Sequence, residues 1–578
     1  MPARFPSLSR FVFVGAVLLA ACKSDTSTTP NLTVDPIPTP SGPLKLGDVV
    51  SVNVNGDSAC RAPVLHPAKV VAIGSKALIL NDTLNPRGFT DADFQRFAAR
   101  FDTLVYPLDV ANFGDPTDID KNGRIIILFT RSVNELTEAR SNSYVGGFAF
   151  SRDLFTKEAT ARTQACPASN QGEYFYLLTP DPQGTINQNV RSVGFVDSVT
   201  TSVLAHEFEH LINASRRLYV NTSSKGFETR WLDEGLAHIA EELLFYREAK
   251  LDTRMNLDLA AIRASNTARL AFNADMSGNA GRYRSFLQAP STNSPYSSFD
   301  SLPTRGATWS FLRYSADRIN ATDGFAAGPA QTVTGQGTVT LSPGASVGEY
   351  IATVANTSQV QDALTSFTLV PSGITAPSPN QFGAGNPLAQ RAAFTVGAEL
   401  QPDARFESRL RQREQFELTA RIPATRAWYA AQGASMMAGS LSRFTGGASA
   451  ADGTLWFRLV NSDTTGFGNL QRVFGTDITP FVRDWLVSNA VDDIAAPATE
   501  YQQRSWNWHS IYPALGGGTY PLVIQTISSS ASIAASVVSG GAAYYRFAVP
   551  ANGTATVTLG VAGGAASSSL HLLIVRTK

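Results

Sequence analysis

Apolar side chains recur every three or four positions in two neighbouring stretches of the chain, and this period predicts two amphipathic helices. The first is expected over residues 195–216 and the second over residues 231–243. Their apolar faces consist of Leu204, Phe208, Leu211 and Ile212 in the first helix, and of Leu232, Leu236, Ile239, Ala240 and Leu243 in the second. Burial of these faces fixes the direction in which the polar residues of each helix point.

Upstream of these helices, alternating or continuous apolar runs predict β-strands. The runs are bounded by turn-forming residues and occupy positions 47–60, 69–81, 124–129 and 172–178. A helix is expected at 89–101, with Thr90 as its N-cap. Together these elements predict a mixed sheet beside the first amphipathic helix.

Downstream, the pattern changes several times. Residues 255–318 have helical spacing, whereas 331–372 alternate as a small β module and a Pro-, Gly- and Asn-rich linker follows to about 388. Helical patterns return at 454–495, and from about residue 527 the alternation predicts a terminal β-sandwich. The predicted fold class is therefore α+β with accessory β-sandwich modules.

The two amphipathic helices carry the residues with the clearest chemistry. His206, Glu207 and His210 form the pattern HExxH, which places both imidazoles on one helix face, four residues apart. Glu234, on the second helix, is the expected third ligand, so that these side chains bind one Zn²⁺. Three protein ligands leave a fourth position open for water, as in catalytic zinc sites, and Glu207 is placed to take a proton from that water.

Two further residues of the second helix lie close to this stripe. Glu241 follows Glu234 by two turns and is placed to accept the free N–H of a zinc-bound imidazole. His238 has two interpretations, a contact near the zinc or a histidine packed against its own partner. The alternative for the whole motif is an ordinary amphipathic helix with surface His and Glu, and the helical context on both sides argues against it.

The stretches HEFEHLINASRR and WLDEGLAHIAEEL resemble the gluzincins, zinc peptidases whose third ligand is a glutamate. Among these they are most similar to the hyicolysin-like bacterial neutral zinc metallopeptidases, and the resemblance extends over roughly residues 45–325 and 454–525. It implies a two-lobed zincin-like fold and peptide-bond hydrolysis. Residue by residue, it implies His206, His210 and Glu234 as zinc ligands and Glu207 as the general base.

The resemblance does not fix the group that stabilises the oxyanion. Related aminopeptidases carry a Tyr three residues before a Gly near the start of a helix, and that position is Pro303 here. The candidates are Tyr296, Arg305, His238 and Tyr219. For each aromatic candidate, packing or a surface position is the alternative.

The N-terminus predicts export and lipid anchoring. Arg4 and Arg10 precede a short apolar run at 11–19, which is followed by Leu-Ala-Ala and Cys22. This resembles the bacterial lipobox, in which cleavage leaves the cysteine as the lipidated first residue, and a plain secretory signal is the alternative. The Ser-, Thr- and Pro-rich residues 23–43 form the expected tether. The expected location is the bacterial cell envelope, lipid-anchored at the outer membrane or cell surface, or the medium.

Cys60 and Cys166 remain once Cys22 is set aside. An even pair in an oxidising compartment predicts one disulfide, which restricts the unfolded chain by closing a long loop. Two buried free thiols are the alternative.

Asp118, Asp120 and Asn122, with Gly123 next in the chain, place oxygen donors at alternate positions as a calcium loop does. The twelfth position is Phe129, where an EF-hand needs a bidentate Glu, so an EF-hand is excluded. A structural Ca²⁺ loop is one interpretation. A tight turn capped by the Asp and Asn side chains is the other, and the pattern favours it.

The charge composition excludes one class of partner. Lys and Arg total 47 and Asp and Glu total 47, so no net field attracts nucleic acid or an anionic membrane surface. Expected partners are a protein or peptide substrate and, through the lipid anchor, a membrane. The sequence does not define an oligomeric state.

These patterns divide the chain as follows: signal peptide 1–22, tether 23–43, zincin catalytic domain 44–326, β module and linker 327–388, helical lobe completing the catalytic domain 389–526, and C-terminal sandwich-like domain 527–578. The favoured function is a zinc endopeptidase. An aminopeptidase with the same zinc chemistry and a non-catalytic binding lipoprotein with a structural zinc are the alternatives.

Overall fold

The computed structural model describes residues 42–56, 60, 63–161, 163–220, 227–251, 257–319, 331–360, 363–377, 479–491, 506, 508–512, 514–515, 521–562 and 568–576. The expected signal peptide with Cys22, nearly all of the tether, and the predicted linker and helices between 378 and 478 lie outside the described residues. Within the described ranges, no helix has both the length and the apolar character that crossing a bilayer requires.

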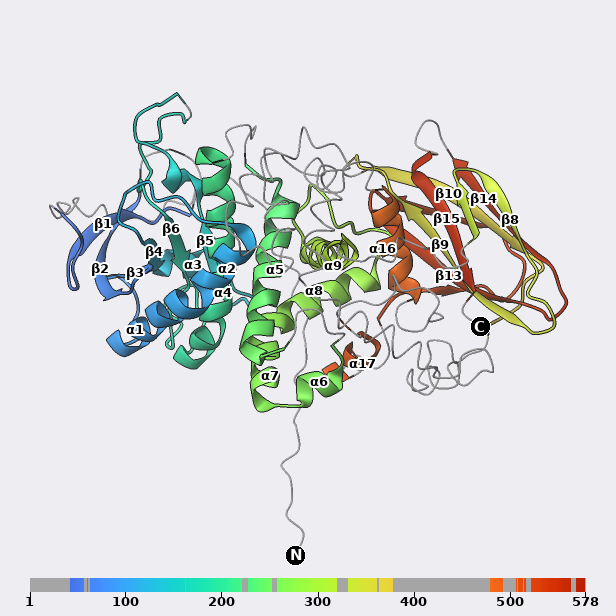
Figure 1. The fold of residues 1–578 in the computed structure, drawn as a ribbon, viewed down its shortest axis with the longest axis horizontal. Coiled ribbons are helices and arrows are strands. Elements are labelled where there is room, and N and C mark those ends of the chain that lie inside the picture. Colours follow the sequence, from blue (N-terminus) through green and yellow to red (C-terminus); the bar gives the residue numbers. More distant parts are fainter. Residues whose placement is uncertain are drawn as a thin grey trace, which may run out of the picture.

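The N-terminal part of the chain forms a six-stranded sheet with the order β1-β2-β3-β4-β6-β5 (Figure 1). Its strands are β1 (Val49–Asn53), β2 (Leu65–Ile73), β3 (Ala77–Asp82), β4 (Ile125–Phe129), β5 (Gly147–Ala149) and β6 (Tyr174–Leu177). The neighbours β3, β4 and β6 are parallel, whereas β1, β2 and β3 pair antiparallel. β5 pairs antiparallel with β6 only, so it is an edge strand of this sheet.

Strand β4 explains why its sequence is apolar throughout. Ile125, Ile127 and Phe129 face one buried cluster, together with residues of α1 (Asp91–Arg100) and α4 (Val193–Tyr219). Ile126 and Leu128 face a second cluster on the other side of the sheet. A strand covered on both faces needs apolar residues at successive positions, as the pattern predicted. Helix α1 begins at the expected N-cap, where Thr90 and Asp93 form a capping box.

Helices lie between the strands of this sheet in the chain and make up most of residues 193–319. In order they are α1, a π-helical turn (Phe101–Val105), α2 (Tyr106–Phe113), α3 (Arg131–Glu135), a 3₁₀ turn (Ser151–Leu154), α4, α5 (Arg230–Ala249), α6 (Leu259–Arg263), α7 (Asn266–Ala271), a second π-helical turn (Phe272–Met276), α8 (Ser277–Gln288) and α9 (Leu302–Ile319). Helix α4 packs against both the sheet and α5, and α5 in turn packs against α9. The two central helices therefore join the sheet to the helical region (Figure 1).

The strands after residue 330 belong to one two-sheet sandwich. They are β7 (Gln331–Thr334), β8 (Gly337–Leu341), β9 (Gly348–Asn356), β10 (Leu364–Ser372), β11 (Gln525–Thr526), β12 (Ile533–Val538), β13 (Ala542–Val549), β14 (Ala555–Ala562) and β15 (Leu570–Arg576). One sheet has the order β12-β10-β14-β8 and the other β11-β13-β9-β15-β7. The sequence assigns these strands to two modules, 327–388 and 527–578, but the structure alternates them within the same sheets. Their shared apolar face is one core, which neither segment buries alone.

Two helices connect this sandwich to the helical region. Helix α16 (Thr479–Val491) packs against α9 and against β9 of the sandwich, and α17 (Trp508–Tyr512) follows it in the chain. Trp485, Trp506 and Trp508 are buried in the cluster that also contains the residues of α5 and α9. The described fold is compatible with the predicted α+β class.

Candidate active site

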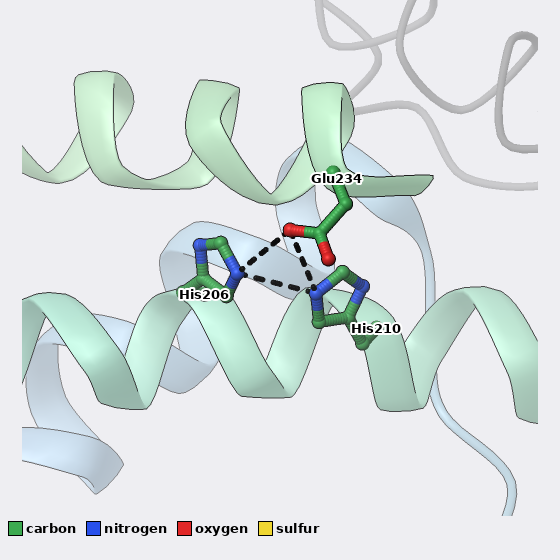
Figure 2. Close-up of side chains that lie close together, drawn as sticks. All are labelled: His206, His210 and Glu234. Atoms are coloured by element: carbon green, nitrogen blue, oxygen red, sulfur yellow. Dashed lines mark hydrogen bonds and ion pairs between the residues drawn. The ribbon is translucent and has the colours of Figure 1, made fainter. Parts of the chain in front are cut away.

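The three predicted zinc ligands come together between α4 and α5 (Figure 2). The Nε2 atoms of His206 and His210 are 3.2 Å apart, and Glu234 Oε2 lies 3.6 and 3.9 Å from them. Ligands at about 2.05 Å from a tetrahedral zinc ion are separated from each other by about 3.3 Å. Two imidazoles and a carboxylate at these distances fit one zinc ion.

Local packing explains why α5 approaches α4 with Glu234 facing the histidines. Gly235, the next residue, lies against α9, where an added Cβ would be 2.3 Å from Thr308 Cγ2 and 2.9 Å from Leu312 Cδ1. Only a residue without a side chain allows α5 and α9 to approach each other this closely. The Gly after Glu234 therefore allows α5 to pack closely against α9 at the level of Glu234.

Both histidines are held by carboxylates on α5. His206 Nδ1 donates a hydrogen bond to Glu241 Oε1 at 2.8 Å, as the sequence predicted for Glu241, and His210 Nδ1 lies 3.1 Å from Asp233 Oδ2. A carboxylate at Nδ1 keeps the proton there and leaves Nε2 free to bind a metal. Asp233 was not predicted from the sequence, although its position beside Glu234 already indicated that it lies near the site.

The charges around the ligands favour a cation. Burial opposes a charge on His206, but its hydrogen bonds to Glu234 and Glu241 outweigh this effect and raise its pKa to about 9. Burial likewise opposes a charge on His210, and the Asp233 carboxylate raises its pKa to about 10. In the metal-free protein, protons thus take the place that a zinc ion would occupy.

Glu207 lies beside the ligands and against the sheet edge. It is only 5% exposed, and a Cβ on Gly147 of β5 would be 2.9 Å from its Cγ. Burial raises the pKa of Glu207, and the charges of His206 and His210 partly offset this rise. A carboxylate with a raised pKa is better suited to accept and return a proton near neutral pH.

Arg305 contacts the ligand Glu234 directly. Its Nη1 lies 2.6 Å from Glu234 Oε2, and its Nε and Nη2 donate to the two oxygens of Asp300 at 2.6 and 2.5 Å. Burial would raise the pKa of Glu234, but the Arg305 charge and the two histidines hold it well below its usual range. Asp300 therefore anchors Arg305, one of the four candidate oxyanion donors, at the site. Asp300 itself was not predicted from the sequence.

His238, a second candidate donor, is fully buried beside the ligands. Its Nδ1 lies 3.1 Å from Glu241 Oε2, and its ring is 4.9 Å from the ring of His206. Burial lowers its pKa to about 3 despite the nearby carboxylate, so this imidazole is neutral. Arg282 Nη1, 3.8 Å from Glu241 Oε2, adds a positive charge that sequence reasoning did not identify.

The other two candidate donors are engaged elsewhere. Tyr296 is fully buried and its hydroxyl donates to the carbonyl oxygen of Ser358 at 2.8 Å, while the hydroxyl of Tyr219 donates to the carbonyl oxygen of Leu154. Both phenols thus fix backbone segments. The structure brings Arg305 and His238, rather than these tyrosines, into contact with the carboxylates of the site.

A pocket of about 90 Å³ opens beside His210. It is lined by Ala149, Phe150, Ser151, His210, Leu211, Asn213, Ala214, Phe227, Glu228 and Asp233. Ala149 ends the edge strand β5 and the next two residues follow it, so the pocket lies between that edge and helices α4 and α5. A peptide that lies along β5 can place one side chain in this pocket.

The remaining predicted residues lie elsewhere. Cys60 and Cys166 form the expected disulfide. Asp118, Asp120 and Asn122 form a turn before β4, in which the backbone N–H groups of Gly123 and Asn122 donate to the two aspartates. Asp118 and Asp120 also approach Glu173, which the sequence analysis did not assign.

Comparison with known proteins gives one partial likeness. No family model matches the chain. Over 166 residues the chain is 31% identical to the neutral metalloprotease ShpI of Staphylococcus hyicus. The aligned segment is 29% of this chain and 34% of ShpI, so the chain spans about a third of the length of the curated relative that it matches.

Proposed function

We propose that this protein is a zinc-dependent endopeptidase with a two-lobed zincin-like catalytic region. The observation that carries the proposal is the meeting of His206, His210 and Glu234 at distances suited to one zinc ion, with Glu207 buried beside them. The partial similarity to a neutral metalloprotease supports the same class of chemistry.

The residues of the chain have separate tasks in this reaction. A zinc ion at the site would acidify a water molecule toward a pKa of ~7 and polarise the scissile carbonyl group. Glu207 accepts the proton from the attacking water and delivers it to the leaving amine, for which its raised pKa is suited. Arg305, which contacts Glu234, and His238, which lies beside His206, are the predicted candidates from which a donor to the oxyanion can come.

The substrate is proposed to be a peptide in an extended conformation. Strand β5 is an edge strand, and its Gly147 lies against Glu207. An extended peptide can pair with such an edge through backbone hydrogen bonds, which places its carbonyl groups along the site. The pocket beside His210 then receives one substrate side chain.

Internal cleavage is favoured over release of N-terminal residues because of how the nearby carboxylates are used. An aminopeptidase needs an acidic group for the α-amino group of its substrate. Among the described residues around the ligands, Asp233 faces His210, Glu241 faces His206, and Asp300 holds Arg305. Each of these carboxylates already has a cationic or hydrogen-bonding partner, and Glu228 in the pocket pairs with Arg217. Glu209, 3.9 Å from His210, is fully buried and does not line the pocket.

Location and anchoring belong to the same proposal and rest on the N-terminal sequence alone. Cleavage before Cys22 and its lipidation would hold the enzyme at the cell envelope on the tether 23–43. Stable anchoring needs more than one acyl chain, which a lipidated N-terminal cysteine supplies.

The test compares zinc content and casein cleavage in the protein that begins at Cys22 and in its Glu207→Gln and Glu138→Gln variants. Glu138 is exposed and lies away from the ligands in the chain, so it controls for loss of one carboxylate. We expect all three proteins to bind one zinc ion per chain, with activity lost only in Glu207→Gln.

A peptide with an acetylated N-terminus separates the two modes of cleavage. An endopeptidase cuts it internally, whereas an aminopeptidase leaves it intact and releases single residues from the free peptide. Zinc binding without cleavage of either peptide would overturn the proposal in favour of a non-catalytic binding protein.

A further inference from the structure

Three carboxylates meet at a second position, where the parallel strands β4 and β6 begin. Asp118 and Asp120 lie in the loop before β4, and Glu173 directly precedes β6. The strands β4 and β6 are parallel neighbours, and Ile126 N–H donates to the Glu173 carbonyl oxygen at 2.8 Å. The loop and Glu173 therefore lie together at the N-terminal ends of these two strands. One oxygen from each carboxylate lies within 4.8 Å of the other two.

Glu173 brings to this group a buried carboxylate that has one unsatisfied oxygen. Its side chain is fully buried, and its Oε1 accepts hydrogen bonds from Thr117 Oγ1 at 2.8 Å and from Ile119 N at 2.9 Å. Its Oε2 is buried without a hydrogen-bond partner among the described residues. A buried carboxylate oxygen without a partner costs free energy, and a bound ion is one of the few ways to remove that cost.

The local electrostatics are unfavourable for three negative charges. Burial raises the pKa of Glu173. Partial burial raises the pKa of Asp120 to about 6, and the negative charges of Glu173 and Asp118 add to the rise. None of the ion pairs among the described residues includes these three carboxylates. A divalent cation would relieve their mutual repulsion.

The loop holds the aspartates in place. Gly123 N–H donates to Asp118 at 3.1 Å, and Asn122 donates from its backbone and side chain to Asp120 at 3.1 and 2.6 Å. The side-chain oxygen of Asn122 accepts from Arg124 N at 2.6 Å. Asn122, expected from the sequence as a third oxygen ligand, therefore acts in the turn, and Glu173 supplies the third carboxylate.

We propose that Asp118, Asp120 and Glu173 bind one Ca²⁺ ion. All the donors are oxygens, which suits a hard cation rather than zinc. Three carboxylate oxygens within 4.8 Å of one another can all contact one Ca²⁺ ion, whose ligands lie about 2.4 Å from it. The exposure of Asp118 and Asp120 leaves room for the water ligands that complete the coordination.

This ion has a structural task that differs from catalysis. The same loop reaches the active-site helix, since Arg216 of α4 donates to the Asp115 carbonyl oxygen at 2.8 Å. A calcium ion that links the loop to β6 thus supports a strand on which α4 packs. We expect the ion to raise thermal stability without being required for zinc binding.

Terbium luminescence reports on this site directly, because Tb³⁺ prefers the same oxygen ligands as Ca²⁺ and a nearby tyrosine sensitises its emission. The Tyr174 ring and Asp120 Oδ2 both lie about 3 Å from the Cβ position of Gly172, so an ion on Asp120 is close to this phenol. The zinc-loaded full chain is titrated with Tb³⁺ and then with Ca²⁺. We expect saturable emission that Ca²⁺ abolishes, and a Ca²⁺-dependent rise in the midpoint of thermal unfolding.

Variants assign the signal. Glu173→Gln, and separately the exposed pair Asp118→Asn with Asp120→Asn, should weaken Ca²⁺ binding at least about tenfold because the site loses charge. Glu158→Gln, an exposed matched control, should not. Emission that is absent, or that persists unchanged in the double aspartate variant, overturns the proposal even if Glu173→Gln fails to fold. None of these readouts depends on peptidase activity.

Discussion

Glu241 offers the sharpest test of how the protein holds the proposed zinc ligands. Its two oxygens face two histidines, with His206 Nδ1 at 2.8 Å and His238 Nδ1 at 3.1 Å. In a Glu241→Gln variant the side-chain oxygen can still accept from His206, but the negative charge is lost and the NH₂ group replaces an acceptor opposite His238. A Glu241→Ala variant loses the charge and both contacts.

The expected size of the effect follows from these contacts. Removing a group that orients a metal-binding histidine typically weakens metal binding 10- to 100-fold, or about 1.4 to 2.8 kcal/mol. Glu241→Gln keeps the hydrogen bond that fixes the His206 ring, so we expect about tenfold weaker zinc binding. Glu241→Ala also frees the ring, so we expect a loss closer to about 100-fold.

Competition with a chromogenic zinc chelator at a fixed pH measures these dissociation constants. Glu248→Gln is the matched control, because Glu248 lies on the same helix but pairs with Arg100 rather than with a ligand. Its zinc Kd should equal that of the wild type. If Glu241→Ala binds zinc as tightly as Glu248→Gln, the carboxylate does not hold His206 for the metal, and the reasoning fails.

Three further changes test the surrounding structure. Gly235→Ala should lower the free energy of unfolding by about 1–3 kcal/mol in urea denaturation, since its Cβ would lie 2.3 Å from Thr308 Cγ2. An unchanged free energy of unfolding would mean that α5 and α9 move apart freely. Burial lowers the pKa of His238 to about 3, below the 6.5 of an unfolded chain, so the unfolded state binds more protons and stability falls as pH drops through this window. The metal-free wild type should therefore lose up to about 1.4 kcal/mol per pH unit more than His238→Gln between pH 6 and 4, and equal slopes would contradict this. Replacing Cys60 and Cys166 by Ser opens a loop with a sequence separation of 106 and should cost at most about 4–5 kcal/mol in the same denaturation assay, whereas no loss would show that the bond does not constrain the unfolded chain.

Local patterns in the sequence were sufficient for the elements and for part of the site. The spacing of His206 and His210 places them on one face of any helix, so their proximity followed directly. Thr90 and the continuous apolar run of β4 were equally local signals, and the structure confirms both. Glu234 could be assigned as the third ligand only from its motif, because the approach of α5 to α4 depends on tertiary packing and not on a local period.

Most of the contacts that the sequence did not reveal join distant residues, as Glu173 joins Asp118. Asp300 is only five residues from Arg305, but it lies before the start of α9, so a helical period does not pair the two. The interleaving of the two β segments is also non-local. Strand β9 pairs with β13 and β15, whose partner residues lie between 187 and 226 positions later in the chain. Alternation alone predicts a strand but never its partner.

Helix α5 shows how the distant C-terminal segment contributes to the site. Glu241 faces the zinc ligands, while the next residue, Glu242, is fully buried on another side of the helix. The indole N–H groups of Trp309 and Trp506 each donate to Glu242 at 2.9 Å. Trp506 lies far beyond the zinc motif in the chain, and without it this carboxylate would lose one of its buried partners, at a cost of about 1–3 kcal/mol. The residues after 478 therefore belong to the core that positions α5, and with it both Glu234 and Glu241.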